Sequence, residues 1–118
     1  AVRRLAARPG AIATALGEVL SEPKAHVWFE KRAARWRPCA VALDPRTRML
    51  YDAQHVFING EAVRARGTDA VLLRRLADRR SLDARAVRGA SRAIKSLLAE
   101  WFAVGWLRAD LPRPTRAP

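Results

Sequence analysis

The side chains of this chain that could carry metal or nucleophilic chemistry are two histidines, His26 and His55, and one cysteine, Cys39. An iron site of the two-histidine-one-carboxylate kind needs three ligands on one face, and in its usual form an acid lies two residues after the first histidine. The residues two places after His26 and His55 are Trp28 and Phe57, so neither histidine fits this pattern. We therefore expect no metal site, and we expect His55 to face solvent or a polar neighbour.

Other catalytic signals are missing from the sequence as well. A single cysteine excludes an internal disulfide and a cysteine-based zinc cluster, and the apolar neighbours of Cys39 favour a buried structural thiol over a reactive one. There is no phosphate loop, dinucleotide fingerprint or Ser/His/Asp arrangement. The acids Asp44, Asp52 and Glu61 fall at expected turns and strand ends, where carboxylates commonly cap. The sequence thus predicts no catalytic, metal-binding or cofactor-binding residue, and no enzyme activity for this chain alone.

The charge of the chain is strongly positive, with 23 Lys and Arg against 11 acids and a formal net charge of +12. Such a field attracts phosphates and acidic surfaces. Almost all of the positive charge is arginine, however, and an excess of Arg and Ala is also what a GC-rich genome produces without selection for binding. Charge alone therefore leaves nucleic acid open as a partner and does not favour it.

The 118 residues are enough for one modest domain. No apolar run reaches the ~20 residues that a bilayer requires, so we expect no membrane partner. Arg3, Arg4 and Arg8 interrupt any secretory signal at the start, and the lack of an initiator Met suggests a piece cut from a longer chain. We expect the protein to be cytoplasmic.

The elements that must position these residues begin with a helix. Pro9 is suited to its first turn, apolar residues recur at helical spacing to about Ser21, and Pro23 ends it. The following stretch mixes Trp28 and Phe29 with basic residues. Such a mixture could stack on nucleic acid, but we favour the interpretation that the two aromatic side chains pack under the domain while the arginines are solvated.

A change to strand patterns follows at Cys39. Short strands are expected around residues 41–43 and 49–51, and Asn59-Gly60 between residues 55–58 and 61–64 predicts a β-hairpin with a type I′ turn. Near the end, Trp106 and Leu107 predict a short strand that returns to this hairpin.

Three helices are expected between the hairpin and that last strand. Thr68 or Asp69 should cap the first and Asp83 the second, with Gly89 as a left-handed stop. Ser91 should cap the third, and Gly105 should close it. The inward stripe of the third helix is formed by Ile94, Leu97, Leu98, Trp101 and Phe102.

Together these elements predict an α+β fold, a winged-helix-like domain in which a β-hairpin and a small antiparallel sheet pack with three helices, preceded by an N-terminal helix. We expect the N-terminal helix and linker over residues 1–36, the winged-helix-like domain over residues 37–111 and a disordered tail over residues 112–118.

The chain resembles the carboxy-terminal part of the bacterial JmjC-type ribosomal oxygenases, also called cupin-like proteins. The resemblance covers most of the chain and lies in the order and spacing of short elements rather than in any one of them. These elements are Ser21-Glu22-Pro23-Lys24, Val27-Trp28-Phe29, Leu50-Tyr51-Asp52, His55 to Glu61, Leu98 to Phe102, and Gly105-Trp106-Leu107.

This resemblance implies a parent with a barrel that carries Fe(II) and 2-oxoglutarate, a helical dimerisation region and a winged helix. Members hydroxylate a ribosomal protein, at an arginine in the bacterial group. The present chain would hold the end of the dimerisation region and the winged helix, and the iron and 2-oxoglutarate ligands would lie upstream. The implied partners are the chain's own upstream catalytic domain, a second copy in a homodimer and a ribosomal protein substrate.

Two functions from different classes follow. The first is a non-catalytic scaffold and interaction module, with Trp28 and Phe29 at a buried junction. The alternative is a nucleic-acid-binding winged helix, but the outer face of its third helix is mostly small or acidic and is poor material for reading bases. The candidate phosphate contacts of the alternative are Arg74, Arg75, Arg79, Arg80, Arg92 and Lys95.

Overall fold

The structure is a computed structural model that describes residues 9–23, 29 and 35–110. Its helices are α2 (Pro9–Ser21), α3 (Gly67–Arg79), α4 (Ala84–Arg88) and α5 (Arg92–Ala103). Its strands are β1 (Val41–Leu43), β2 (Met49–Tyr51), β3 (His55–Ile58), β4 (Glu61–Arg64), β5 (Ser81–Leu82) and β6 (Leu107–Ala109). The predicted N-terminal helix, hairpin and three later helices are all present, which confirms the α+β winged-helix class. The predicted disordered tail lies outside the described residues.

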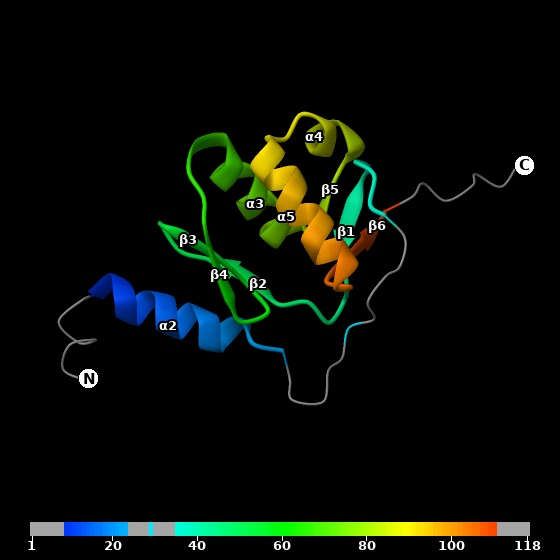
Figure 1. Ribbon diagram of the computed structural model, residues 1–118. Helices are drawn as coiled ribbons and strands as arrows, with labels where there is room; N and C mark the ends of the chain where they lie inside the picture. The colour runs from blue at the N-terminus through cyan, green and yellow to red at the C-terminus, as the bar shows by residue number, and fades with distance from the viewer. Residues whose placement is uncertain (1–8, 24–28, 30–34, 111–118) are drawn as a thin grey trace, which may run out of the picture.

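The strands form two antiparallel sheets of three strands each, in the orders β5-β1-β6 and β2-β3-β4. Figure 1 shows α3, α4 and α5 gathered on one side of the molecule, while α2 lies against the sheet of β2, β3 and β4 at the opposite end. The prediction that the last strand returns to the hairpin is wrong. Strand β6 pairs with β1, with Leu107 opposite Leu43, so this strand completes the other sheet.

The hairpin of β3 and β4 forms as predicted. Asn59 and Gly60 have φ values of 46° and 89°, the positive values that a type I′ turn needs at both central residues. Ile58 then pairs with Glu61 and Val56 with Val63. The register of the two strands is therefore the one that a two-residue type I′ turn at Asn59-Gly60 requires.

Two predictions about helix ends are wrong. Helix α3 begins at Gly67, and its N-cap Arg66 offers no side-chain hydrogen bond, so neither Thr68 nor Asp69 caps it. Gly89 has a φ of −82° and does not supply a left-handed stop. A left-handed stop that was not predicted ends α3 at Arg80, which has a φ of 61°, just before β5 begins.

The capping predictions for the two later helices are confirmed. Asp83 accepts a hydrogen bond from the Ala86 N–H at 2.7 Å, and the Ser91 hydroxyl accepts one from the Ile94 N–H at 3.2 Å. Beyond the end of α5, Gly105 adopts a φ of 84°. The Trp106 N–H then bonds back to the Trp101 carbonyl at 2.8 Å, the arrangement of a Schellman motif.

The core lies between the two sheets and the inner faces of α3 and α5. Fully buried side chains from the sheets, such as Val41, Ile58 and Leu107, meet Leu73 and Leu76 of α3. Helix α5 contributes the predicted stripe, which is buried at Ile94, Leu98, Trp101 and Phe102 and half-buried at Leu97.

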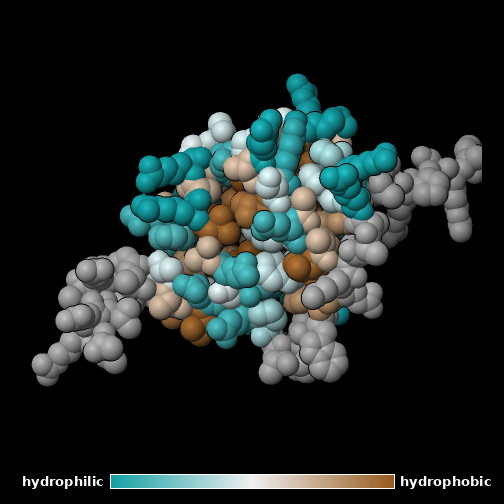
Figure 2. Space-filling model, in the orientation of Figure 1, coloured by the Kyte–Doolittle hydropathy of each residue, from teal (hydrophilic) through white to brown (hydrophobic). Residues whose placement is uncertain are grey.

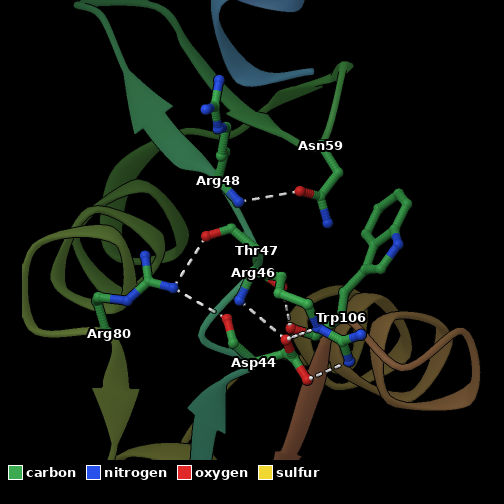
Figure 3. Close-up of polar contacts among 7 residues, drawn as sticks. All are labelled: Asp44, Arg46, Thr47, Arg48, Asn59, Arg80 and Trp106. Carbon is green, nitrogen blue, oxygen red and sulfur yellow. Dashed lines mark hydrogen bonds and ion pairs between the residues drawn. The ribbon is translucent and has the colours of Figure 1, made fainter. Parts of the chain in front are cut away.

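Arg80 joins the end of α3 to the loop between β1 and β2 (Figure 3). Its Nη2 donates to the carbonyls of Asp44 at 3.0 Å and Thr47 at 2.9 Å. The Thr47 hydroxyl, in turn, donates to the Trp106 carbonyl at 2.6 Å. One guanidinium therefore fixes the loop through which the chain passes from one sheet to the other.

We expect the Arg80→Ala variant to lose about 1–2 kcal/mol of unfolding free energy, because two partly buried carbonyls lose their donor. Urea denaturation of the 118-residue chain would measure the loss. Arg79→Ala is the matched control, since Arg79 is exposed and should change stability by less than about 0.5 kcal/mol. Equal stability of the two variants would show that the Arg80 contacts contribute nothing.

Candidate interaction surfaces

Two of the three acids predicted at turns and strand ends, Asp52 and Asp44, accept backbone N–H groups of their own turns. Asp52 accepts hydrogen bonds from the backbone N–H groups of Gln54 at 2.8 Å and His55 at 2.7 Å, and the Gln54 N–H in particular holds the pKa of this carboxyl below its ordinary value. The Nδ1 of His55 lies 3.8 Å from the same carboxylate oxygen. Within residues 9–23, 29 and 35–110, no three His, Cys, Asp or Glu side chains group as a metal site would require.

Asp44 is likewise engaged by its own turn. Its carboxylate accepts hydrogen bonds from the backbone N–H and the Nε of Arg46, both at 2.9 Å. The guanidinium of Arg46 holds the pKa of Asp44 below its ordinary value. This carboxylate therefore stabilises the entry to the loop between the sheets and is not presented to a ligand.

Helix α2 docks on the hairpin through its small residues. Gly17 and Ser21 are buried, and a Cβ atom added to Gly17 would overlap the aromatic ring of Phe57 in β3. The Ser21 hydroxyl accepts a hydrogen bond from the Gly60 N–H at 2.9 Å and donates to the Glu18 carbonyl at 3.1 Å. Two elements of the family resemblance, the Ser21 segment and Asn59-Gly60, thus meet at this contact.

The larger apolar side chains of α2 lie on its other side. Leu16, Val19 and Leu20 are 55%, 61% and 55% exposed, and we call these three residues the α2 apolar face. Figure 2 shows brown, apolar surface at the lower left of the molecule, where α2 lies. Apolar side chains that recur at helical spacing ordinarily mark the buried side of a helix. Here they form a surface that the described part of the chain does not cover.

The predicted junction at Trp28 and Phe29 is described only at Phe29, because Trp28 lies outside the described residues. The Phe29 ring is half-buried and meets the Trp106 ring edge to face, with centroids 6.4 Å apart. The guanidinium of Arg46 lies 5.4 Å from the centre of the Phe29 ring. Phe29 therefore packs on the domain, as the favoured interpretation expected, and part of its surface is taken up inside the chain.

Two of the candidate phosphate contacts have roles inside the fold. Arg80 binds the loop carbonyls described above. Arg74 donates from Nη2 to the Ala53 carbonyl at 3.1 Å, and its guanidinium lies 5.7 Å from the centre of the Tyr51 ring. The Tyr51 hydroxyl donates to the Asp78 carboxylate at 2.9 Å, and this bond raises the pKa of Tyr51. Arg74 and Tyr51 thereby connect α3 to strand β2 and the loop after it.

The other candidates do not converge on one surface. Arg75 lines a cleft between α3 and the region of α4, whereas Arg74 lines a different cleft beside the hairpin. Arg79 and Arg92 are exposed and Lys95 is half-buried. Figure 2 shows hydrophilic side chains projecting separately over the upper part of the molecule, where α3, α4 and α5 lie.

The outer face of α5 is unsuited to reading bases. Apart from Arg92 near its start, its exposed residues are alanines, a serine and Glu100. Specific contacts in the major groove come from Arg, Lys, Asn or Gln side chains that reach base edges. The structure thus gives the helix that a DNA reader would insert no set of side chains for base recognition.

Sequence reasoning missed Arg64 and Arg66. Both line the cleft beside the hairpin together with Arg74, although each belongs to a different element or turn. No local motif marks this grouping, since it arises only when the loop after β2 folds against the start of α3.

None of the helices in the described ranges has the length and apolar character needed to cross a membrane.

Comparison with known proteins supports the architecture. A family model described as ROXA-like winged helix matches residues 4–108. An X-ray structure of Escherichia coli YcfD covers 91% of this chain at 18% identity with a TM-score of 0.74. Structures of YcfD, described as a ribosomal oxygenase from E. coli, in complex with cobalt and succinic acid or with cobalt and 2-oxoglutarate give TM-scores of 0.76 and 0.72, at 18% and 17% identity. A comparison with curated proteins gave no match.

The coverage of these structures is unequal. The chain spans about a third of the YcfD chain, 32% by length, while 91% of its own residues are matched. At this level of identity the likeness establishes a shared fold.

Proposed function

Because the chain belongs to the ROXA-like winged-helix family, we propose that it is a non-catalytic scaffold and interaction module of a larger ribosomal oxygenase. The fold shared with about a third of YcfD supports a parent of that class. In this proposal residues 1–36 end a helical dimerisation region and residues 37–111 form the winged helix. The parent is a cytoplasmic Fe(II)- and 2-oxoglutarate-dependent enzyme that hydroxylates an arginine of a ribosomal protein.

The side chains described here do not fit an iron site. The Asp52 oxygen that lies 3.8 Å from the His55 Nδ1 already accepts two backbone N–H groups. No third His, Cys, Asp or Glu joins this pair within the described ranges. An iron of this kind takes two histidines and a carboxylate as ligands. In our proposal, therefore, residues upstream in the parent hold the iron and the 2-oxoglutarate.

The observation that carries the proposal is the α2 apolar face. Leu16, Val19 and Leu20 are each more than half exposed, although α2 is fixed to the hairpin by Gly17 and Ser21 on its other side. Burying a leucine or valine side chain stabilises a protein by about 1.5–3 kcal/mol. A helix that is docked on one side and apolar on the other is suited to join the winged helix to a further helical layer. We propose that this layer is the dimerisation region of the parent, where the α2 apolar face takes part in the contact between the two subunits.

The gene that encodes this chain provides the direct test. We expect its reading frame to continue upstream of Ala1 into a barrel with a His-x-Asp motif and a distal histidine. A start codon immediately before Ala1 would overturn the proposal.

The double variant Leu16→Gln, Leu20→Gln tests the α2 apolar face in the parent protein. Since two leucines lose their burial, we expect the association of the parent's subunits to weaken by on the order of 100-fold or more. Analytical ultracentrifugation would measure it, and the melting temperature of the 118-residue chain alone should change little, because both side chains are exposed there.

The control for this test is Val71→Gln. Val71 lies on α3 and is 56% exposed, so it matches the two leucines in apolar character and exposure but is not on α2. It should leave association unchanged. Equal effects of the control and the double variant, or no effect of either, would refute the docking role of the α2 apolar face.

Nucleic-acid binding by the winged helix is the alternative function, and the geometry gives it less support. Its candidate contacts do not converge on one surface, Arg80 is engaged by two loop carbonyls, and the outer face of α5 lacks side chains for base recognition. Its distinguishing prediction is affinity for duplex DNA or ribosomal RNA that falls steeply with salt.

A further inference from the structure

A cleft of about 410 Å³ lies where the end of β4 and the start of α3 face the loop between β2 and β3. Three of its lining side chains are arginines and none is acidic. The lining residues are Ala53, Gln54, Arg64, Ala65, Arg66, Gly67, Ala70 and Arg74. A cleft with three cationic side chains and no acid among its walls is a site of strongly positive potential.

We infer that this cleft binds a phosphate that is free or a terminal monoester, such as inorganic phosphate. The inference goes beyond the proposed function, since neither the oxygenase nor the α2 apolar face requires it. It rests on the convergence of Arg64, Arg66 and Arg74, and each of these contributes in a different way.

Arg74 is the fixed cation of the cleft. Its Nη2 is bound to the Ala53 carbonyl at 3.1 Å, and its guanidinium stands over the Tyr51 ring. These contacts hold the side chain in one place before any ligand arrives. A cation that is already ordered loses less conformational entropy on binding than a free one.

Arg64 and Arg66 are the exposed arginines of the cleft. Both side chains are exposed, and neither forms an ion pair with another described residue. Asp52, the acid in the loop that faces them, accepts the N–H groups of Gln54 and His55 at its Oδ1, and its charge acts on Arg74. Two guanidinium groups at the mouth of the cleft are thus left to pair with an external anion.

The start of α3 adds to the same field. The N-cap residue Arg66 makes no side-chain hydrogen bond to the N–H groups of the first turn, which lie at the positive end of the helix dipole; Asp69 is the acid in this turn. Gly67 has a φ of +58°, and a Cβ atom built on it would meet nothing within 4 Å. The space in front of this turn is therefore open to a ligand, in addition to the arginines that carry the inference.

A phosphate matches this arrangement better than a carboxylate does. A phosphate monoester carries about −1.5 to −2 charges at neutral pH and offers three terminal oxygens. A carboxylate carries one charge and two oxygens, and would leave the three guanidinium groups largely unneutralised. Guanidinium groups bind phosphate oxygens in pairs, which adds geometric specificity to the charge attraction.

The test is a titration of the 118-residue chain followed by amide NMR. Sodium phosphate, a ten-nucleotide single-stranded RNA and a polyglutamate peptide are added separately, with sodium chloride at equal ionic strength as the blank. We expect inorganic phosphate to shift the amide signals of Gly67 and Thr68, and chloride to leave them unchanged.

The variant Arg64→Gln, Arg66→Gln should raise the apparent Kd by about tenfold for each arginine removed. Arg79→Gln, Arg88→Gln removes the same charge from two exposed residues that do not line the cleft, and should leave the Kd nearly unchanged. The two double variants have equal net charge, so a difference between them reports the site and not the overall field.

Each outcome decides the matter. Shifts with inorganic phosphate that depend on Arg64 and Arg66 support the site, whereas shifts with RNA alone would overturn it in favour of a nucleic-acid backbone as the ligand. No shift, equal shifts with chloride, tighter binding of polyglutamate, or equal losses in the two double variants would overturn it. None of these results depends on association through α2.

Discussion

Replacing Trp101 by alanine is expected to lower the free energy of unfolding by about 3–5 kcal/mol. Trp101 is 2% exposed and lies on the inner face of α5, within the core that this helix shares with both sheets and α3. Its carbonyl also accepts the Trp106 N–H that turns the chain from α5 into β6, although that backbone bond survives the substitution. Since a domain of this size has about 5–15 kcal/mol in total, the variant should be close to unfolded.

Chemical denaturation followed by far-UV circular dichroism would measure this loss. Glu100→Ala is the matched control, because Glu100 is the preceding residue of the same helix and is exposed. The control should change stability by no more than about 0.5 kcal/mol. A Trp101→Ala variant as stable as the Glu100→Ala control would contradict the core described here.

Replacing Gly17 by leucine should detach α2 from the hairpin. Even one added carbon at this position would overlap the ring of Phe57, which is itself 1% exposed and has no room to move outward. Overpacking of this kind costs about 1–3 kcal/mol or more. The helix can avoid that cost by leaving the surface, and it would then also lose the hydrogen bond between Ser21 and Gly60.

Hydrogen exchange and limited proteolysis would detect the detachment. We expect the Gly60 amide to lose its protection and α2 to become cleavable, while β1, β5 and β6 remain protected. Ala15→Leu introduces the same side chain at an exposed position of the same helix and should leave docking intact. Replacing a glycine within a helix by leucine ordinarily stabilises the helix itself, so a loss of docking would come from the overlap with Phe57 and not from helix propensity. An undisturbed Gly60 amide in the Gly17→Leu variant would rule out this packing.

Local signals in the sequence predicted the parts of the fold that neighbouring residues decide. Asn59-Gly60 specified its turn, because both positions need positive φ. Asp83 and Ser91 specified helix starts, because each side chain bonds an N–H three residues ahead. In each of these cases the partner groups lie within a few residues of one another.

The errors fall where distant segments decide. Strand β6 pairs with β1 across more than sixty residues, and no pattern near Trp106 distinguishes that partner from the hairpin. Arg80 adopts a left-handed conformation that glycine usually supplies, and its side chain binds two loop carbonyls far away in sequence. Those contacts offset the conformational cost of a left-handed arginine at the end of α3.

The candidate sites follow the same division. The sequence identified exposed arginines of α3 and α5 one helix at a time, but it could not show that Arg74 is anchored by the Ala53 carbonyl. It could not group Arg64 and Arg66 with Arg74, because the cleft forms only in the tertiary structure. The apolar period of α2 was visible in the sequence, yet only the contact between Gly17 and Phe57 shows which side of the helix is left uncovered.

The pairing of β1 with β6 has a consequence for how this unit can be moved between proteins. The Asp110 N–H bonds to the Ala40 carbonyl at 2.8 Å, so the chain enters and leaves the two-sheet unit at neighbouring points. A domain whose two ends lie close together can be inserted into a surface loop of another protein without distorting the backbone of that loop. The two-sheet unit has the geometry of an insertable domain, and α2 lies outside it as the element that could contact the rest of a larger protein.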